Sequence, residues 1–302
     1  MNAESVPVHA AQGLSDVPSP LAAHASQGAT GAPGVAVLMA VHAGANPDHF
    51  AEAVASIRAQ TAANVRLYLW CDGPLPAAHE AVIDATCVPV DVVLRSPRPV
   101  GLPAGLNRLI DAALADPCIG FLARMDADDI SLPARLERQL AFLHRHADVS
   151  IVGTWVVEFT LPDVPLFHKR LPTSPEEARR FMVYRSPLAH PTVIFRRAVF
   201  EAGHRYDHAL LQAQDYELWS RLLLAGFEIS NVPEYLLWYR MAGDFYGRRT
   251  GWSRAVTELK ERLRYARASG LLRPRHVLGL ASLFLIRIAP VGIKRLAYRA
   301  LR

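Results

Sequence analysis

The sequence predicts an α/β fold built on a doubly wound, mainly parallel sheet. A continuous apolar run at 35–41 is typical of a strand buried on both faces. Strand-like and helix-like segments then alternate as far as residue 125, which is the pattern of a parallel sheet with crossover helices. Acidic residues stand where two of these strands end, and parallel sheets bind ligands at that edge.

The first part of the chain supplies the regular alternation. We expect strands at 35–41, 65–70, 90–94 and 119–125, and helices at 47–60, 76–86 and 103–114. Asp72 and Asp126 each come just after a strand, so both side chains should lie at the carboxyl edge of the sheet.

The second part is more mixed. A helix is expected over 132–146, with Ser131 as its N-cap and Pro133 in its first turn. Another helix is expected over 215–225, where Gly226 is a natural stop. The remaining expected elements are strands at 150–159 and 191–196, an extended segment at 228–240 interrupted by Pro233, and helices at 252–268 and 275–300.

Composition divides the chain into three parts. Residues 1–33 are rich in small residues, Pro and His without periodicity, and we expect a disordered leader there. Residues 34–245 form the globular part, and 302 residues at 51% hydrophobic are enough for a substantial core. Residues 246–302 form a basic, amphipathic helical tail.

The cysteines and the amino-terminal residues indicate the compartment. There are three cysteines without CxxC spacing, which argues against a disulfide framework or a thiolate zinc site and favours a reducing, cytoplasmic location. No secretory signal and no apolar run of about 18 residues is recognisable, so we expect neither export nor an ordinary membrane span.

The stretch 124–129 is the most informative motif, because an apolar strand runs directly into three carboxylates. Mg²⁺ and Mn²⁺ prefer oxygen ligands and are commonly held by one or two carboxylates together with substrate phosphates. Asp126 and Asp128 are two residues apart and could meet one cation from the same turn. The alternative is an acidic turn that precedes the next helix.

The sequence around this motif resembles family 2 inverting glycosyltransferases of the GT-A fold. Residues 125–137, MDADDISLPARLE, carry the most specific part of the resemblance. Further similar segments follow in the family's order at 37–42, 56–61, 101–107, 190–196, 214–219 and 239–240. The resemblance implies a nucleotide-sugar-binding half at 34–130 and an acceptor-binding half at 131–245.

The resemblance also implies roles for individual residues. Asp72 would contact the nucleotide base, Asp126 would lie near the ribose, and Asp128 would bind Mg²⁺ or Mn²⁺ between the two phosphates. Asp215 would be the general base that deprotonates an acceptor hydroxyl, and a single displacement with one base implies inversion. The other expected contacts are His42, Gly101 and Asn107 for the nucleotide sugar, and His190 and Gln214 for the acceptor.

These residues predict an enzyme that moves a sugar from a nucleotide-diphosphate donor, expected to be a UDP-sugar, to a glycan or lipid-linked acceptor in cell-surface polysaccharide biosynthesis. The sequence departs from the family at Cys71, where an Asp is usual, and at Gln214, where a Glu is usual. The alternative is therefore a non-catalytic descendant that binds a nucleotide or glycan. No GxGxxG follows the first strand, which disfavours a dinucleotide dehydrogenase.

Several of these residues have a simpler interpretation. Asp72 could be only a turn residue, Asp215 only a favoured acid in a first helical turn, and Asn107 a local packing residue. Cys71 is expected to be a small buried residue. His190 could equally be a buried histidine, and Trp219 and Trp238 are expected in the core.

The tail has a distinctive charge pattern. Ten basic and no acidic residues follow Glu261, and they flank the apolar stretch 277–286. This pattern suits a helix over 275–302 that lies at the surface of an anionic membrane, which would place the protein at the inner face of the cytoplasmic membrane. The alternatives are packing on the catalytic domain or a subunit contact. No nucleic-acid partner is expected, because no binding motif accompanies the charge.

Overall fold

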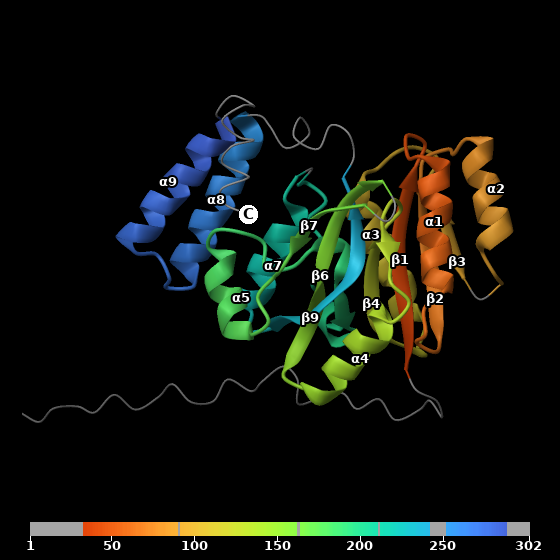
Figure 1. The fold of residues 1–302 in the computed structure, drawn as a ribbon, viewed down its shortest axis with the longest axis horizontal. Helices are drawn as coiled ribbons and strands as arrows, with labels where there is room; N and C mark the ends of the chain where they lie inside the picture. Colours follow the sequence, from red (N-terminus) through yellow and green to blue (C-terminus); the bar gives the residue numbers. More distant parts are fainter. Residues whose placement is uncertain (1–32, 90, 162–163, 211, 242–251, 289–302) are drawn as a thin grey trace, which may run out of the picture.

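The computed structural model describes residues 33–89, 91–161, 164–210, 212–241 and 252–288. A central sheet is covered by helices on both faces, and a pair of carboxyl-terminal helices lies at one end of the sheet (Figure 1). The leader 1–32 and the end of the tail, 289–302, lie outside the described residues.

The first half alternates strands and helices as the sequence predicts. Its elements are β1 (Gly34–His42), α1 (Pro47–Arg58), β2 (Val65–Asp72), α2 (Ala77–Thr86), β3 (Val92–Arg95), α3 (Leu102–Ala115) and β4 (Ile119–Asp126). Strand β1 lies between β2 and β4 and is parallel to both, and β2 is parallel to β3. The predicted doubly wound half is confirmed.

The second half completes the sheet with mixed strands. Its elements are β5 (Ile130–Ser131), α4 (Arg135–Arg145), β6 (Val149–Leu161), β7 (Val164–Lys169), α5 (Pro175–Met182), the 3₁₀ turn η1 (His190–Thr192), β8 (Ile194–Arg196), α6 (Ala198–Glu201), α7 (Gln214–Leu224) and β9 (Glu228–Arg240). The strand order is β3-β2-β1-β4-β8-β6-β9-β5, and β7 pairs with β6. Strand β8 is antiparallel to both of its neighbours.

Three local predictions in this half need correction. Ser131 is not an N-cap: it lies in β5, its hydroxyl oxygen accepts a hydrogen bond from Arg135 Nε at 2.7 Å, and α4 begins four residues later than that cap. The expected strand 191–196 begins as a 3₁₀ turn, because Pro191 cannot donate to a strand ladder. Strand β9 continues through Pro233, where the register with β6 shifts while Pro233 and Glu234 are exposed.

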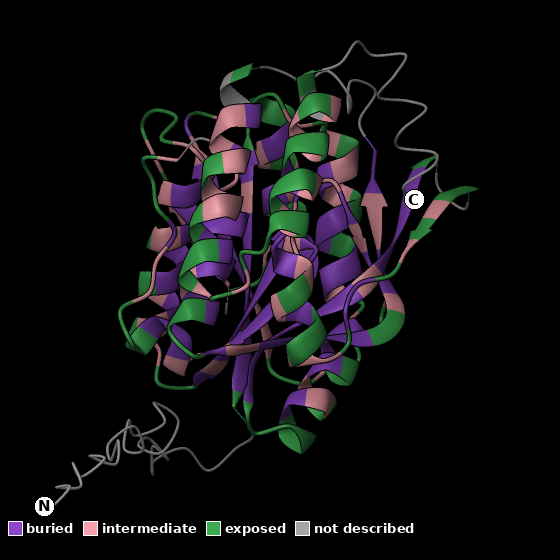
Figure 2. Ribbon diagram, turned by 90° about the vertical axis from the view of Figure 1, so that its left-hand side faces the viewer, coloured by how far each residue is buried: buried purple, intermediate pink, exposed green. Residues whose placement is uncertain are grey.

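The sheet separates two apolar layers. One contains side chains of α3, α5, α7 and α8 (Trp252–Ala268), and the other contains side chains of α1, α2 and α4. Alternate residues of β1 face the two layers: Ala36 and Leu38 face the first, whereas Val35 and Val37 face the second. Figure 2 shows these buried strands behind helices whose outer sides are exposed. The result is a rigid sheet that positions the residues at its carboxyl edge.

The tail begins with α8 and continues with α9 (Pro274–Ile288), which lies on the outer side of α8 (Figure 1). Tyr265 and Ala266 of α8 are buried in the first apolar layer, so this helix is part of the folded body. Leu280 anchors α9, and a Cβ at Gly279 would come within 2.7 Å of the Tyr184 ring. Among the described helices, none combines the length and the apolar character needed to cross a bilayer.

Candidate active site

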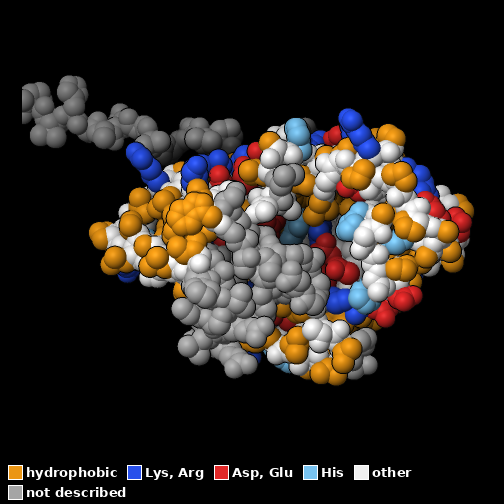
Figure 3. Space-filling view, turned by 90° about the horizontal axis from the view of Figure 1, so that it is seen from above, with side chains coloured by type: hydrophobic (Ala, Val, Ile, Leu, Met, Phe, Trp, Pro, Cys, Tyr) orange, Lys and Arg blue, Asp and Glu red, His pale blue; other side chains and the backbone are white. Residues whose placement is uncertain are grey.

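The carboxyl ends of three neighbouring strands place a group of polar side chains at one edge of the sheet. His42 of β1 is in register with Asp72 of β2, and Ala40 of β1 is in register with Asp126 of β4. We call His42, Asp72, Asp126, Asp128 and Asp129 the carboxylate edge. Seen from this end, the surface has a hollow with acidic side chains inside it and basic and histidine side chains around it (Figure 3).

Asp72 connects β2 to the start of α3. Its carboxylate accepts hydrogen bonds from the backbone N–H groups of Val100 at 2.8 Å and Gly101 at 3.1 Å, and from Trp70 Nε1 at 3.2 Å. Gly101 has φ of +89°, a conformation that side chains rarely adopt, and it precedes the first turn of α3. Asp72 therefore has a structural role in this turn, and it remains partly exposed.

Three carboxylates follow the end of β4. Each of Asp126, Asp128 and Asp129 offers an oxygen, and these atoms lie within 4.8 Å of one another. Asp129 is buried, and its Oδ1 accepts from the backbone N–H of Arg240 at 2.8 Å. Arg240 Nε donates to the backbone oxygen of Asp128 at 2.7 Å, and its guanidinium also pairs with Glu52 of α1. Arg240 thus fixes the turn from the end of β9.

The electrostatics of this turn favour a divalent cation. Burial and the neighbouring charge of Asp126 raise the pKa of Asp128, and burial together with both neighbouring carboxylates raises the pKa of Asp129 well above its ordinary value. The ionised carboxylates therefore repel one another in a partly desolvated place. Asp129 Oδ2 is buried without a hydrogen-bond partner among the described residues. An oxygen-preferring cation such as Mg²⁺ or Mn²⁺ fits this donor set.

Arg124 is a residue of this site that the sequence prediction did not include. It lies on β4, its side chain is only 3% exposed, and it forms an ion pair with Asp126. Its Nε and Nη1 are buried with no hydrogen-bond partner among the described residues. A charged residue inside the apolar strand 119–125 is the signal that could have identified it, since buried cations require a partner.

A second group of polar side chains lies around the start of α7. We call His190, Tyr206, Gln214 and Asp215 the Tyr206 group. His190 Nε2 lies 2.8 Å from the Tyr206 hydroxyl, and the His190 ring meets the Trp219 ring edge-on at 6.0 Å. Burial is the main reason why the pKa of Tyr206 is raised, and the negative charges of Asp215 and Asp126 raise it further.

Arg124 connects the two groups electrostatically. Burial lowers the pKa of His190 well below its ordinary value, and the positive charge of Arg124 lowers it further. Burial raises the pKa of Tyr206 and of Asp128, and the positive charge of Arg124 opposes this by lowering both pKa values. His190 is therefore neutral at pH 7, and Asp215 stands partly exposed at the second residue of α7. Gln214 is the first residue of that helix and is also partly exposed.

The side-chain amide of Asn107 binds the backbone of Tyr206. Its Nδ2 donates to the backbone oxygen of Tyr206 at 2.8 Å, and its Oδ1 accepts from the backbone N–H of Tyr206 at 2.9 Å. Both the nitrogen and the oxygen of the amide therefore bind the chain, which agrees with the alternative of local packing. Tyr206 is a further residue that the sequence prediction missed, because its partners are 99 residues away in Asn107 and 16 residues away in His190.

The simpler interpretations hold for Cys71 and Trp219. Cys71 is fully buried, and burial raises the pKa of its thiol to about 11, which makes it unreactive. Trp219 is fully buried in the core. Trp238 is partly buried and packs against Phe159, with ring centroids 5.4 Å apart.

Comparisons with known proteins identify the family of the chain. The family model described as "Glycosyl transferase family 2" matches residues 37–203, which is more than half of the chain. The amylovoran biosynthesis glycosyltransferase AmsE of Erwinia amylovora is 29% identical over 87% of this chain and 97% of its own length. A UDP-Gal:alpha-D-GlcNAc-diphosphoundecaprenol beta-1,3-galactosyltransferase of Escherichia coli is 27% identical over 88% of this chain and 96% of its own length.

Solved structures share the fold. TarS 1–349 of S. aureus in complex with UDP-GlcNAc matches with a TM-score of 0.61 at 15% identity, over 84% of this chain and 72% of that chain. The mannosyltransferase PcManGT of Pyrobaculum calidifontis, solved with GDP-Man and Mn²⁺, matches with a TM-score of 0.56 at 13% identity, over 90% of this chain and 80% of that chain. The predicted GT-A fold is thereby confirmed, and the chain belongs to glycosyltransferase family 2 and is a glycosyltransferase.

Proposed function

We propose that this enzyme moves one sugar, with inversion, from a nucleoside-diphosphate sugar to a hydroxyl group of a glycan or lipid-linked acceptor in cell-surface polysaccharide biosynthesis. The observation that carries the proposal is a carboxylate cluster that could hold a cation, together with a separate carboxylate, Asp215, whose charge acts on Tyr206 as that of Asp126 does. The printed names of two relatives support it, since one acts in amylovoran biosynthesis and the other uses UDP-Gal and a diphosphoundecaprenol acceptor.

We assign the carboxylate edge to the donor. Asp72 would contact the nucleotide base beside Gly101 and His42, Asp126 would contact the ribose, and Asp128 would hold Mg²⁺ or Mn²⁺. The bound cation would neutralise the charge that develops on the leaving diphosphate. Asp126 is turned toward Arg124 by their ion pair, which leaves Asp128 as the better placed cation ligand. A UDP-sugar is the proposed donor, in keeping with the complexes of TarS with UDP and with UDP-GlcNAc.

We assign the Tyr206 group to the acceptor. A carboxylate at Asp215 can accept the proton of an attacking hydroxyl, which is a poor nucleophile without a base. Gln214 and His190 would contact the acceptor. A Glu at position 214 would place a second negative charge beside Asp215, whereas Gln214 keeps the size of the side chain without that charge. This half corresponds to 131–245 of the proposed catalytic domain 34–245.

The experiment is sugar transfer and donor hydrolysis by the purified full chain with a panel of nucleotide sugars, with and without Mn²⁺ or Mg²⁺. The wild type should turn over at least one donor only when the cation is present. Asp215→Asn should lower kcat by about 10²–10⁴-fold and leave nucleotide binding intact, because a general base contributes about that much. Asp207→Asn, an exposed acid eight positions earlier, is the matched control and should retain activity. Nucleotide binding without any turnover would favour the non-catalytic alternative and refute transfer.

We also propose that α9 contacts the inner face of the cytoplasmic membrane. Leu278, Ala281, Leu285 and Ile288 lie at helical spacing and are exposed, with Leu278 at 71% and Leu285 at 61%. Hydrophobic side chains gather at the end of the molecule formed by α8 and α9 (Figure 3). Arg273 and Arg275 beside this stripe are exposed, and basic residues next to an apolar helix face favour anionic lipid.

Liposome co-sedimentation tests the membrane contact. Leu278→Ser and Leu285→Ser together should weaken binding to vesicles that contain anionic lipid, and high salt should weaken it further. Leu161→Ser and Leu166→Ser, at exposed positions of β6 and β7, are the matched control and should bind like the wild type. Equal binding by both double variants would remove α9 from the contact.

A further inference from the structure

Tyr206 is near enough to Asp126 and to Asp215 for both carboxylate charges to act on it, and its backbone is held by a side chain of α3. The side-chain amide of Asn107 makes two hydrogen bonds with the backbone of Tyr206, one as donor at 2.8 Å and one as acceptor at 2.9 Å. This is the pattern by which one strand binds another, supplied here by a single side chain of α3. The backbone of Tyr206 is therefore fixed to the helix that follows the Gly101 turn.

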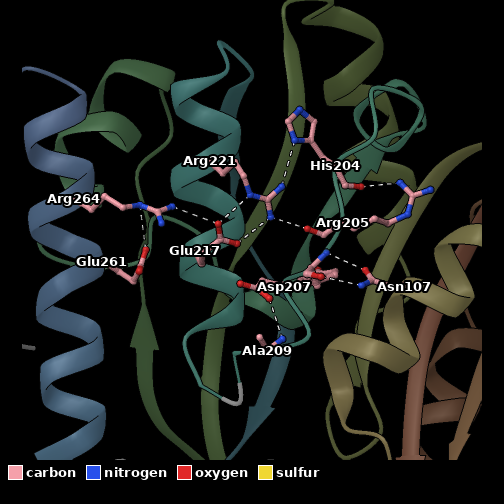
Figure 4. Close-up of polar contacts among 10 residues, drawn as sticks. Asn107, His204, Arg205, Asp207, Ala209, Glu217, Arg221, Glu261 and Arg264 are labelled. Carbon is pink, nitrogen blue, oxygen red and sulfur yellow. Dashed lines mark hydrogen bonds and ion pairs between the residues drawn. The ribbon is translucent and has the colours of Figure 1, made fainter.

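The residues before Tyr206 are held just as firmly (Figure 4). Arg205 forms an ion pair with Asp111 of α3 at 2.9 Å. Arg221 of α7 donates to the backbone oxygen of Arg205 at 2.6 Å and is itself held by both carboxylate oxygens of Glu217 at 2.9 Å. The segment is thus clamped between α3 and α7, and α7 is the helix that carries Asp215.

The Tyr206 side chain extends from this clamp into the site. It is 3% exposed, and its hydroxyl lies 2.8 Å from His190 Nε2. Burial keeps the pKa of Tyr206 raised, so the hydroxyl retains its proton, and His190 is neutral. A protonated hydroxyl facing a neutral imidazole at this distance can donate to it, which leaves the imidazole proton on Nδ1.

We propose that Tyr206 is a positioning residue for the reaction: its hydroxyl fixes the ring orientation and the Nδ1–H tautomer of His190, and Asn107 holds Tyr206 in place. The inference rests on the proposed function, in which His190 contacts the acceptor. The inference gives Asn107 a role on the acceptor side. Asn107 nevertheless lies on α3, the helix that begins beside Asp72. Neither residue touches the reacting atoms in this assignment.

The first test separates acceptor effects from donor effects. Tyr206→Phe keeps the buried ring and removes the hydroxyl, so kcat/KM for the acceptor should fall about tenfold while the affinity for the nucleotide in the presence of Mn²⁺ is unchanged. Asn107→Asp, which keeps the size but loses the donor to the Tyr206 carbonyl, should change kinetics in the same direction. In a His190→Ala background, Tyr206→Phe should have no further effect. An undiminished effect in that background would overturn the proposal.

Tyr265→Phe is the matched control. Tyr265 is buried in the same apolar layer, and its hydroxyl donates to the backbone oxygen of Arg179 at 3.1 Å, away from the site. Its loss should lower the melting temperature as much as the loss of the Tyr206 hydroxyl does, without changing kcat/KM. Equal kinetic effects of the two tyrosine variants would show a merely structural role for Tyr206.

The second test does not depend on activity. Nitrogen-15 NMR of the histidine rings reports the tautomer of His190, assigned by its absence in His190→Ala. The wild type should show a proton on Nδ1, and Tyr206→Phe should change the tautomer or raise the pKa of His190. An unchanged His190 signal would overturn the positioning role even in a preparation that transfers no sugar. A wild type with this signature but without turnover would instead refute the proposed function alone.

Discussion

At the carboxylate edge, Asp72 and Asp126 are placed by the ends of two parallel strands, whereas in the Tyr206 group the side chains stand on segments held by polar clamps. The strands β1, β2 and β4 are paired along most of their length, so the two aspartates are fixed by backbone hydrogen bonds. Tyr206 depends instead on Asn107 and on Arg221. The difference implies that single side-chain changes disturb the Tyr206 group more readily than the position of the carboxylate edge.

After the loss expected for Asp215→Asn, the largest effect is expected at Asp128, and it separates activity from stability. Asp128→Asn should lower transfer by about 10²–10³-fold, because removing one electrostatic stabiliser of a transition state costs about that much. It should also abolish the rise in melting temperature that Mn²⁺ and nucleotide produce together. Since the pKa of Asp128 is raised in the folded protein, its charge opposes folding at pH 7. The cation-free variant should therefore be at least as stable as the wild type by thermal unfolding.

Asp84→Asn is the control for that prediction. Asp84 is exposed on α2, so its neutralisation should change neither the cation response nor the transfer rate. A cation-dependent shift that survives in Asp128→Asn would assign the ion to other ligands of the cluster.

The next largest effect is expected for a substitution on α3, and it tests whether the packing of this helix holds Asp72 of the carboxylate edge in position. A Cβ at Gly105 would come within 2.4 Å of the Trp70 ring, and Trp70 Nε1 donates to Asp72. Gly105→Ala should lower the free energy of unfolding by about 1–3 kcal/mol, the usual cost of overpacking, and should also weaken nucleotide binding. Urea unfolding and nucleotide titration measure the two effects.

Gly226→Ala provides the matched comparison. Gly226 has φ of +88° with nothing within 4 Å of the added Cβ, so the cost is backbone strain of about 1–2 kcal/mol. Nucleotide affinity should be unchanged in this variant. Equal nucleotide affinities for the two alanine variants would show that Trp70 does not position Asp72.

A smaller effect on stability is expected for the ion pair that holds the segment before Tyr206. It can be compared with a surface ion pair in which the two residues are also four positions apart. Glu217 pairs with Arg221, and its side chain is 8% exposed, whereas Glu176 pairs with Arg180 and is 78% exposed. Glu217→Gln should lower the free energy of unfolding by about 1–2 kcal/mol because a charged partner is lost in a buried place. Glu176→Gln should cost less than about 0.5 kcal/mol. Similar values from denaturant unfolding would contradict the assigned importance of the clamp.

The same contrast explains what the sequence could predict. The apolar run of β1 and the strand before Asp126 identify their elements from local pattern, because burial on both faces leaves a continuous signal. Ser131 misled the prediction, since its hydroxyl is engaged by Arg135 and Gln60 and the helix starts after Ala134. A good cap residue is only a local preference, and tertiary contacts override it.

The residues that the sequence prediction missed share one property. Tyr206 is held by Asn107, which is 99 residues away, and the charge of Arg124 acts on His190, which lies in another element. No spacing rule connects position 107 with 206. The motif singled out Asn107 as a ligand contact, but its amide binds the backbone of Tyr206, and the sequence pattern could not distinguish the two.

The smallest expected effect is the pH dependence that His190 gives to stability. Burial and the charge of Arg124 hold the folded-state pKa of His190 well below 6.5, while Tyr206 and Trp219 supply no negative charge to oppose this. The unfolded chain therefore binds the proton first, so this contribution to stability is present above pH 6.5 and is lost as the pH falls toward the folded-state pKa. The free energy of unfolding of the wild type should decline more steeply between pH 7 and pH 5 than that of His190→Gln, which cannot titrate.

Taking the difference between the two proteins removes the contribution of His204, whose pKa is also lowered by burial. Parallel declines would mean that His190 is protonated in the folded protein, and the neutral imidazole assigned to the acceptor side would have to be abandoned together with the Tyr206 hydrogen bond that selects its tautomer.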